Sequence, residues 1–177
     1  MPAASATRPL AGEFLPYFGT YIDVVPDGDL MGVLEASIGI TRKLLSTVSE
    51  ERAGYRYAEG KWSIKEVIGH MSDTERIFTY RLLTFARGDA GPQPGFDENS
   101  YTPAQQSDRV PFTWLLDEFT AVRAATLALL RVLPPEAWER RGVASTHPLS
   151  VRASAWIIAG HEIHHRRVLE ERYLSAR

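Results

Sequence analysis

The sequence contains no cysteine among its 177 residues. This absence excludes disulfide bonds, zinc sites built on thiolates and a catalytic thiol supplied by the protein. Any thiol that takes part in a reaction must therefore come from a bound small molecule. An excess of positive charge is also missing, since 20 Lys and Arg stand against 22 Asp and Glu. Proteins that bind nucleic acid normally carry a basic surface, so we expect no nucleic-acid partner.

Long apolar runs are absent too. No run approaches the roughly 18 residues that a membrane-spanning helix needs. The stretch MPAASATRPLAGEF lacks the charged start and apolar centre of a signal peptide. We therefore expect a soluble cytoplasmic protein with no membrane partner. No segment of useful length alternates between apolar and polar residues, so we expect no β-sheet.

Apolar residues recur at helical spacing in four segments, which are separated by breaks rich in Pro and Gly. The clearest helix start is at Ser63, because Ser63 and Glu66 have the spacing of a capping box. The predicted helices cover approximately residues 29–48, 63–88, 111–133 and 150–174.

Two segments lie outside this pattern. Residues 1–26 are rich in proline and form a predicted N-terminal arm, which aromatic side chains attach to the rest of the protein. Residues 88–110 form a long polar connection, and loops of this length in compact domains are often functional. The remaining chain, residues 27–177, has the size of a single domain. The sequence thus predicts an all-α fold, a four-helix bundle with a long crossover loop.

Three of the five histidines lie in the stretch His161–His165. His161 and His165 are four residues apart, so a helix places both on one face. A lone histidine on an apolar helix face is more often a hydrogen-bonded core residue, but two buried imidazoles side by side are costly unless both are satisfied. His70 borders the apolar seam of the second predicted helix and can point into the same space. Three neutral imidazoles with an open fourth position form a typical catalytic zinc site, so we predict a metal site on His70, His161 and His165.

The stretch HEIHH also matches the metalloprotease pattern H-E-x-x-H. The protease interpretation fails because Val168 and Glu171 stand where the extended motif requires Gly and His, and because no sheet is predicted to hold a peptide. His164 competes with His165 for the ligand role, but we expect it at the edge of the helix. Glu66 is the nearest candidate for a fourth ligand that would close a structural site, although the predicted capping box already uses it.

Three motifs carry a resemblance to a known family. The stretch WSIKEVIGH at residues 62–70, followed by DTER at 73–76, is similar to the first signature of the DinB/YfiT-like family. The stretch AGHEIHH at residues 159–165 resembles its second signature, and PGFDE at 94–98 resembles the connecting loop of many members. The similarity extends over about residues 27–174. It implies a four-helix bundle of DinB/YfiT-like type, usually a homodimer, with zinc or nickel on His70, His161 and His165.

The resemblance also implies a range of functions on small-molecule substrates. Relatives include metal-dependent transferases and isomerases that use a low-molecular-weight thiol such as bacillithiol or mycothiol, and others are described as hydrolases. We therefore predict a small-thiol-dependent S-transferase with an open three-His site. The alternatives are a hydrolase that uses metal-bound water, and a bundle that binds a metal or ligand without catalysis.

Three further residues are candidates for the site. Glu162, next to His161, is predicted to orient a ligand or accept a proton, and the alternative is an exposed glutamate paired with Arg166. Phe96 and Asp97, in the long connection, are predicted to form a wall of the pocket that binds the cofactor.

Overall fold

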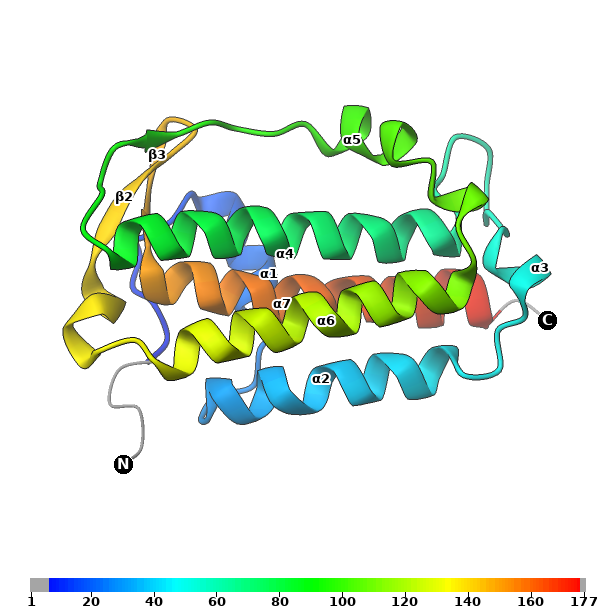
Figure 1. Ribbon diagram of the computed structural model, residues 1–177, viewed down its shortest axis with the longest axis horizontal. Helices are drawn as coiled ribbons and strands as arrows, with labels where there is room; N and C mark the ends of the chain where they lie inside the picture. The colour runs from blue at the N-terminus through cyan, green and yellow to red at the C-terminus, as the bar shows by residue number, and fades with distance from the viewer. Residues whose placement is uncertain (1–6, 176–177) are drawn as a thin grey trace.

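The computed structural model describes residues 7–175, and four long helices form its body (Figure 1). Residues 1–6 of the predicted arm and residues 176–177 of the predicted domain lie outside the described residues. The long helices are α2 (Leu30–Leu45), α4 (Ile64–Ala86), α6 (Phe112–Arg131) and α7 (Val151–Val168). Each falls within one predicted helical segment, so the helical part of the prediction is confirmed.

Short elements connect and flank the long helices. No helix in the described part of the chain is long and apolar enough to cross a membrane. The short helical elements are η1 (Pro16–Phe18), α1 (Gly19–Ile22), α3 (Glu50–Ala53), α5 (Glu98–Gln105), η2 (Ser107–Arg109), η3 (Pro135–Glu139) and the π-helical η4 (Leu169–Leu174).

Local sequence signals fix where the helices begin. The Ser63 hydroxyl accepts a hydrogen bond from the Glu66 backbone, and the Glu66 carboxylate accepts one from the Ser63 backbone at 2.8 Å. This is the predicted capping box. Ser150 caps α7 by accepting a hydrogen bond from the Ala153 backbone. Because a cap fixes the first turn, it also fixes which side chains further along the helix face the core.

The four helices form a bundle in which α4 and α6 run one way and α2 and α7 run the other (Figure 1). Both α4 and α2 pack against α6 and α7. Parallel helices need a connection that returns along the bundle, and residues 87–111 make this return between α4 and α6 (Figure 1). This connection is not a structureless loop, since it contains a short strand, α5 and η2.

The prediction that no sheet is present is wrong. A small three-stranded sheet lies at one end of the bundle, where β2 (Arg141–Ala144) and β3 (His147–Ser150) form an antiparallel hairpin. The strand β1 (Pro92–Gln93), from the long connection, pairs in parallel with β2. Strands of two to four residues are too short for apolar alternation to be seen in the sequence.

The segment before α2 contacts the bundle through α1, which packs against α7. A Cβ atom added at Gly160 of α7 would lie 1.9 Å from the Tyr21 carbonyl oxygen, so glycine is needed for this close approach. Phe14, Phe18 and Tyr21 pack against the core as expected, whereas the Tyr17 side chain is exposed.

The core has two apolar halves with polar side chains between them. One half contains residues near the sheet, such as Phe78 and Trp156, and the other contains residues near η4, such as Met71 and Phe119. Buried polar side chains from all four long helices lie at intermediate positions of their helices. They include Ser37, Thr41, His70, Ser72, Thr74, Glu75, Arg81, Arg123, Thr126, His161 and Glu162.

Candidate metal centre

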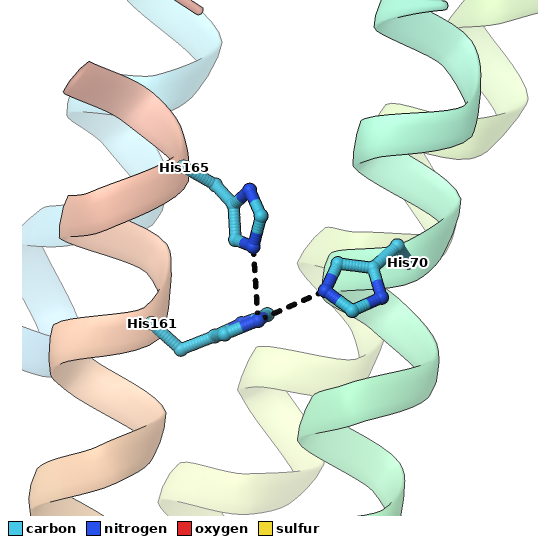
Figure 2. Close-up of side chains that lie close together, drawn as sticks. All are labelled: His70, His161 and His165. Carbon is cyan, nitrogen blue, oxygen red and sulfur yellow. Dashed lines mark hydrogen bonds between the residues drawn. The ribbon is translucent and has the colours of Figure 1, made fainter. Parts of the chain in front are cut away.

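The structure brings the three predicted histidines together across the contact between α4 and α7. Figure 2 shows His161 and His165 on one helix and His70 on the other, with their rings directed toward one another. The His161 Nε2 atom lies 3.0 Å from Nε2 of His70 and 3.0 Å from Nε2 of His165. We refer to His70, His161 and His165 as the histidine triad.

The Thr74 hydroxyl lies beside His70, one member of the histidine triad. The Thr74 Oγ1 atom, one turn after His70, lies 3.4 Å from its Nδ1 atom. In the tautomer that carries its proton on Nδ1, His70 donates to this oxygen and the lone pair on Nε2 faces the other two histidines. Partners of this kind commonly fix the tautomer of histidines that bind metals.

Burial keeps the triad neutral. The His70 and His161 side chains are 7% and 5% exposed. Burial lowers the pKa of His70 to about 4. Burial, followed by the charges of the neighbouring imidazoles, lowers the pKa of His161 and His165 well below the usual value. All three are therefore neutral at pH 7, the protonation state that a metal ligand requires.

The donor set fits a transition-metal ion. Three ring nitrogens face one point, and the ligand atoms lie within 4.8 Å of one another. Ligands about 2.0 Å from a tetrahedral zinc ion are separated by about 3.3 Å, close to the spacing observed. Among residues 7–175, no carboxylate joins this group, so a bound ion would keep a position open. Glu66, the candidate fourth ligand, is held by the Ser63 backbone and by Arg56 instead.

The triad lies in the wall of a cavity of about 240 Å³. The helix α4 contributes His70, Thr74, Phe78 and Arg81, which share one face because they are four, four and three residues apart. Other segments complete the wall. They supply Tyr17, Phe18, Tyr21, Trp62, Phe96, Glu98 and Ser145.

A second polar cluster lies beside the triad in the bundle interior. Arg123 of α6 donates two hydrogen bonds to the Glu75 carboxylate of α4, at 2.9 and 2.8 Å, and one to Glu162 of α7, at 2.6 Å. Thr41 of α2 donates to the other Glu162 oxygen at 2.7 Å. Opposite charges outweigh the effect of burial and raise the pKa of Arg123 above its usual value. We refer to Glu75, Arg123 and Glu162 as the buried ion cluster.

Comparison with known proteins identifies the family of this chain. Residues 34–169 match the model of the DinB superfamily. The chain belongs to the DinB superfamily. A comparison with curated proteins gave no significant sequence match.

Solved structures of two proteins share the fold. YfiT from Bacillus subtilis, described as a probable metal-dependent hydrolase with an unusual four-helix bundle topology, is 16% identical, with a TM-score of 0.74 over 84% of this chain and 88% of YfiT. A mycothiol-dependent maleylpyruvate isomerase is 14% identical, with a TM-score of 0.66 over 81% of this chain. The match covers 61% of the isomerase, so this chain corresponds to less than two thirds of it. At these identities the similarity establishes the fold.

The remaining predicted site residues occupy different places in this DinB-superfamily bundle. Phe96 lines the cavity that holds the triad. Asp97 is not among the lining residues, and its carboxylate caps α5 by accepting a hydrogen bond from the Asn99 backbone. Its neighbour Glu98 reaches the cavity.

Glu162 is neither exposed nor paired with Arg166, so the alternative given for it is wrong. Its carboxylate turns to Arg123 and Thr41, toward α6 and α2. His164 packs against the Tyr21 ring with centroids 5.4 Å apart, at the edge of the triad. In the H-E-x-x-H pattern, the two histidines belong to the histidine triad, whereas Glu162 faces another side of α7.

Sequence reasoning missed several cavity residues. Tyr21 packs edge-on against His161 with ring centroids 5.3 Å apart, and Trp62 lies 4.7 Å from the His70 ring. In the sequence, Tyr21 was only part of the predicted N-terminal arm, and Trp62 was only part of the first family motif. The sequence contained one signal that could have predicted Arg81 as a cavity residue, because Arg81 lies 11 residues after His70 and so shares its helix face.

Proposed function

We propose that this chain is a metal-dependent enzyme that uses a small thiol to modify a small-molecule electrophile. The observation that carries the proposal is the convergence of three neutral imidazole nitrogens in a cavity wall, without a fourth protein ligand among the described residues. When bound there, a divalent metal such as zinc or nickel lowers the pKa of a coordinated thiol, so that thiolate is available at neutral pH.

The side chains around the triad support this proposal. Thr74 orients His70, while Tyr21 and Trp62 pack against the triad rings and limit the access of water. The cavity volume of about 240 Å³ suits a small molecule. The chain has no cysteine, so the thiol has to be a ligand. The comparison with a mycothiol-dependent isomerase of the same fold is consistent with such a thiol.

Glu162 was predicted either to orient a ligand or to accept a proton. Because both of its oxygens accept hydrogen bonds from Thr41 and Arg123, we now assign it a positioning role through α7. The hydrolase remains the second candidate, because YfiT is described as a probable metal-dependent hydrolase. The homodimer and the cytoplasmic location stay predictions.

The first test of the metal centre is the amount of metal bound to the purified protein. We expect His161→Ala to lose the bound zinc or nickel that the wild-type protein carries, as measured by plasma mass spectrometry. His147→Ala is the matched control, because His147 is an exposed residue of strand β3 and takes no part in the triad. Retention of full metal occupancy by His161→Ala would show that the triad is not the metal site.

Turnover then separates the candidate functions. We expect the metal-loaded protein to conjugate small electrophiles with at least one member of a panel of small thiols. Turnover of esters or amides without any thiol would favour the hydrolase instead. A metal-loaded protein that is inactive in both assays would favour metal or ligand binding without catalysis.

A further inference from the structure

Arg81 differs from the other buried cations of the protein. Three cationic side chains are buried among residues 7–175, namely Lys65, Arg81 and Arg123. Lys65 forms an ion pair with Glu50, and Arg123 pairs with two glutamates. Within the described part of the chain, Arg81 has no carboxylate at ion-pair distance. Its hydrogen bond goes to the Pro94 carbonyl oxygen, at 2.7 Å.

An unpaired buried cation is costly for a folded protein, because a charge removed from water needs a compensating partner. Arg81 is 5% exposed, and burial lowers the pKa of its guanidinium below the usual value. A guanidinium still carries its charge at pH 7. A single carbonyl oxygen leaves most of its five N–H donors free for another partner.

Arg81 lines the cavity that holds the triad, and it also lines a neighbouring cavity next to Pro94 and Phe96. Arg81 lies 11 residues after His70 on the same face of α4, which separates their Cα atoms by about 16 Å along the helix axis. Side chains in helices lean toward the N-terminus, which here means toward His70. The Arg81 guanidinium follows this direction, since its Cζ atom lies 5.2 Å from the centroid of the Phe78 ring.

Aromatic side chains form much of the wall between the two ends, together with Thr74 of α4. Phe18, Phe78 and Phe96 line the cavity together with the triad and Arg81. Arg81 is the one cationic side chain in the described part of the lining, whereas Glu98 is the one acidic side chain and repels any anion, so a bound carboxylate is expected at Arg81. The chemistry that fits is a small apolar body with one carboxylate, because the flat guanidinium matches a carboxylate with two parallel hydrogen bonds.

We propose that Arg81 is a specificity-determining residue that binds a carboxylate of the small molecule in this cavity, at the end away from the histidine triad. The role of Arg81 extends the proposed function and rests on it, because the proposed function places the reacting atoms of the small molecule at the histidine triad. The carboxylate belongs either to the electrophile or to the thiol, and both sources present the same group to Arg81.

Direct binding tests the proposal without any turnover. Benzoate and benzamide have the same shape and differ in the carboxylate, and calorimetry measures their binding to protein freed of metal by dialysis against EDTA. We expect benzoate to bind at least tenfold more tightly than benzamide. We expect Arg81→Gln, which keeps an N–H donor for Pro94, to remove that preference, and Arg81→Lys to retain part of it.

A matched control is available on the same helix. Arg76 pairs with Glu118 on the surface and is absent from the lining of this cavity. Arg76→Gln should therefore leave benzoate binding unchanged. Equal benzoate affinity in wild-type protein and in folded Arg81→Gln would overturn the proposal. Benzoate binding that requires the metal and ignores Arg81 would overturn it as well.

Kinetics with matched reagents identify the source of the carboxylate. In S-alkylation a carbon–sulfur bond forms, iodide leaves and the thiol proton passes to solvent. If the electrophile supplies the carboxylate, Arg81→Gln should raise KM at least tenfold for iodoacetate and leave KM for iodoacetamide unchanged. If the thiol supplies it, the same contrast should appear between cysteine and cysteamine. Equal effects within both pairs would contradict the proposal.

The two proposals fail in different ways. An inactive protein that binds benzoate through Arg81 refutes the thiol transferase and supports the carboxylate site. An active enzyme whose Arg81→Gln variant keeps wild-type KM values for all four reagents refutes the carboxylate site and leaves the transferase in place.

Discussion

At the scale of single residues, Arg123 connects the whole bundle. From α6 it bonds Glu75 of α4, Glu162 of α7 and the Leu34 carbonyl oxygen of α2 at 3.1 Å, so one side chain contacts all three other long helices. The side chains of the buried ion cluster are at most 4% exposed. Two carboxylates and one guanidinium leave it with one net negative charge, next to the site proposed for a divalent cation.

Removal of Arg123 should destabilise the fold strongly. In Arg123→Met two buried carboxylates lose their partner, so we expect a loss of about 3–5 kcal/mol in the free energy of unfolding. Urea unfolding followed by circular dichroism measures the loss. Arg131→Met is the control, because the exposed pair of Arg131 with Glu35 contributes at most about 1 kcal/mol. Similar losses in the two variants would contradict this account of the buried ion cluster.

Glu13 should make stability depend on acid pH. Burial raises its pKa, but hydrogen bonds from Arg152, Ser150 and the Leu10 backbone outweigh burial and lower the pKa from 4.5 to about 2. A depressed pKa means that the ionised group stabilises the folded state above pH 4.5 and that this contribution disappears as the pH falls to about 2.

The comparison with Glu13→Gln tests this linkage. The difference in unfolding free energy between the wild-type protein and this variant should be largest at pH 7 and close to zero at pH 2. A difference that stays constant between these pH values would show that the carboxylate charge is not the source of the stabilisation.

At the scale of elements, two glycines allow close packing directly before the triad histidines. Gly160 precedes His161 and faces the backbone of α1, while Gly69 precedes His70 and faces the Gln105 side chain of α5, 1.9 Å from an added Cβ. Neighbouring elements can therefore approach the ligand-bearing helices at the level of the triad. The site is enclosed because these positions lack side chains.

Gly160→Ala should displace α1. The new methyl group would overlap the Tyr21 carbonyl oxygen, so we expect a loss of about 1–3 kcal/mol and a shift of Tyr21 away from His161. Gly39→Ala is the control, since nothing lies within 4 Å of its added Cβ and alanine favours a helix by about 1 kcal/mol. In thermal unfolding, the melting temperature should therefore fall for Gly160→Ala and rise for Gly39→Ala. A stabilised Gly160→Ala would contradict the close approach.

The elements also show what the sequence could predict. Helical spacing predicted the four helices, the capping box predicted the start of α4, and the spacing of His161 and His165 predicted one face of the site. The burial of Glu162 was missed because α7 packs against α1, α2 and α4, so more than one of its faces is buried. The cavity role of Arg81 was missed because it depends on a connection, residues 87–111, whose path only tertiary contacts determine.

At the scale of the whole molecule, the triad joins segments that are distant in sequence. His70 and His161 are 91 residues apart, and their contact forms only when α4 and α7 have packed together. A metal that binds the folded state alone stabilises this packing, by about 2.7 kcal/mol when its concentration is 100 times Kd.

Zinc should therefore raise the melting temperature of the metal-free protein, and EDTA should reverse the increase. Differential scanning calorimetry measures both effects. In His165→Ala the increase should be lost, whereas His147→Ala should keep it in full. An equal increase in His165→Ala and wild-type protein would place the stabilising ion elsewhere.

The cavity wall has two origins, and this has an evolutionary consequence. The triad lies on packed helices, whereas Phe96, Glu98 and Ser145 reach the cavity from connecting segments. Connecting segments accept substitutions and insertions much more readily than packed helices do. A lineage with this fold can therefore acquire new substrates through changes in two short segments while its metal ligands stay the same.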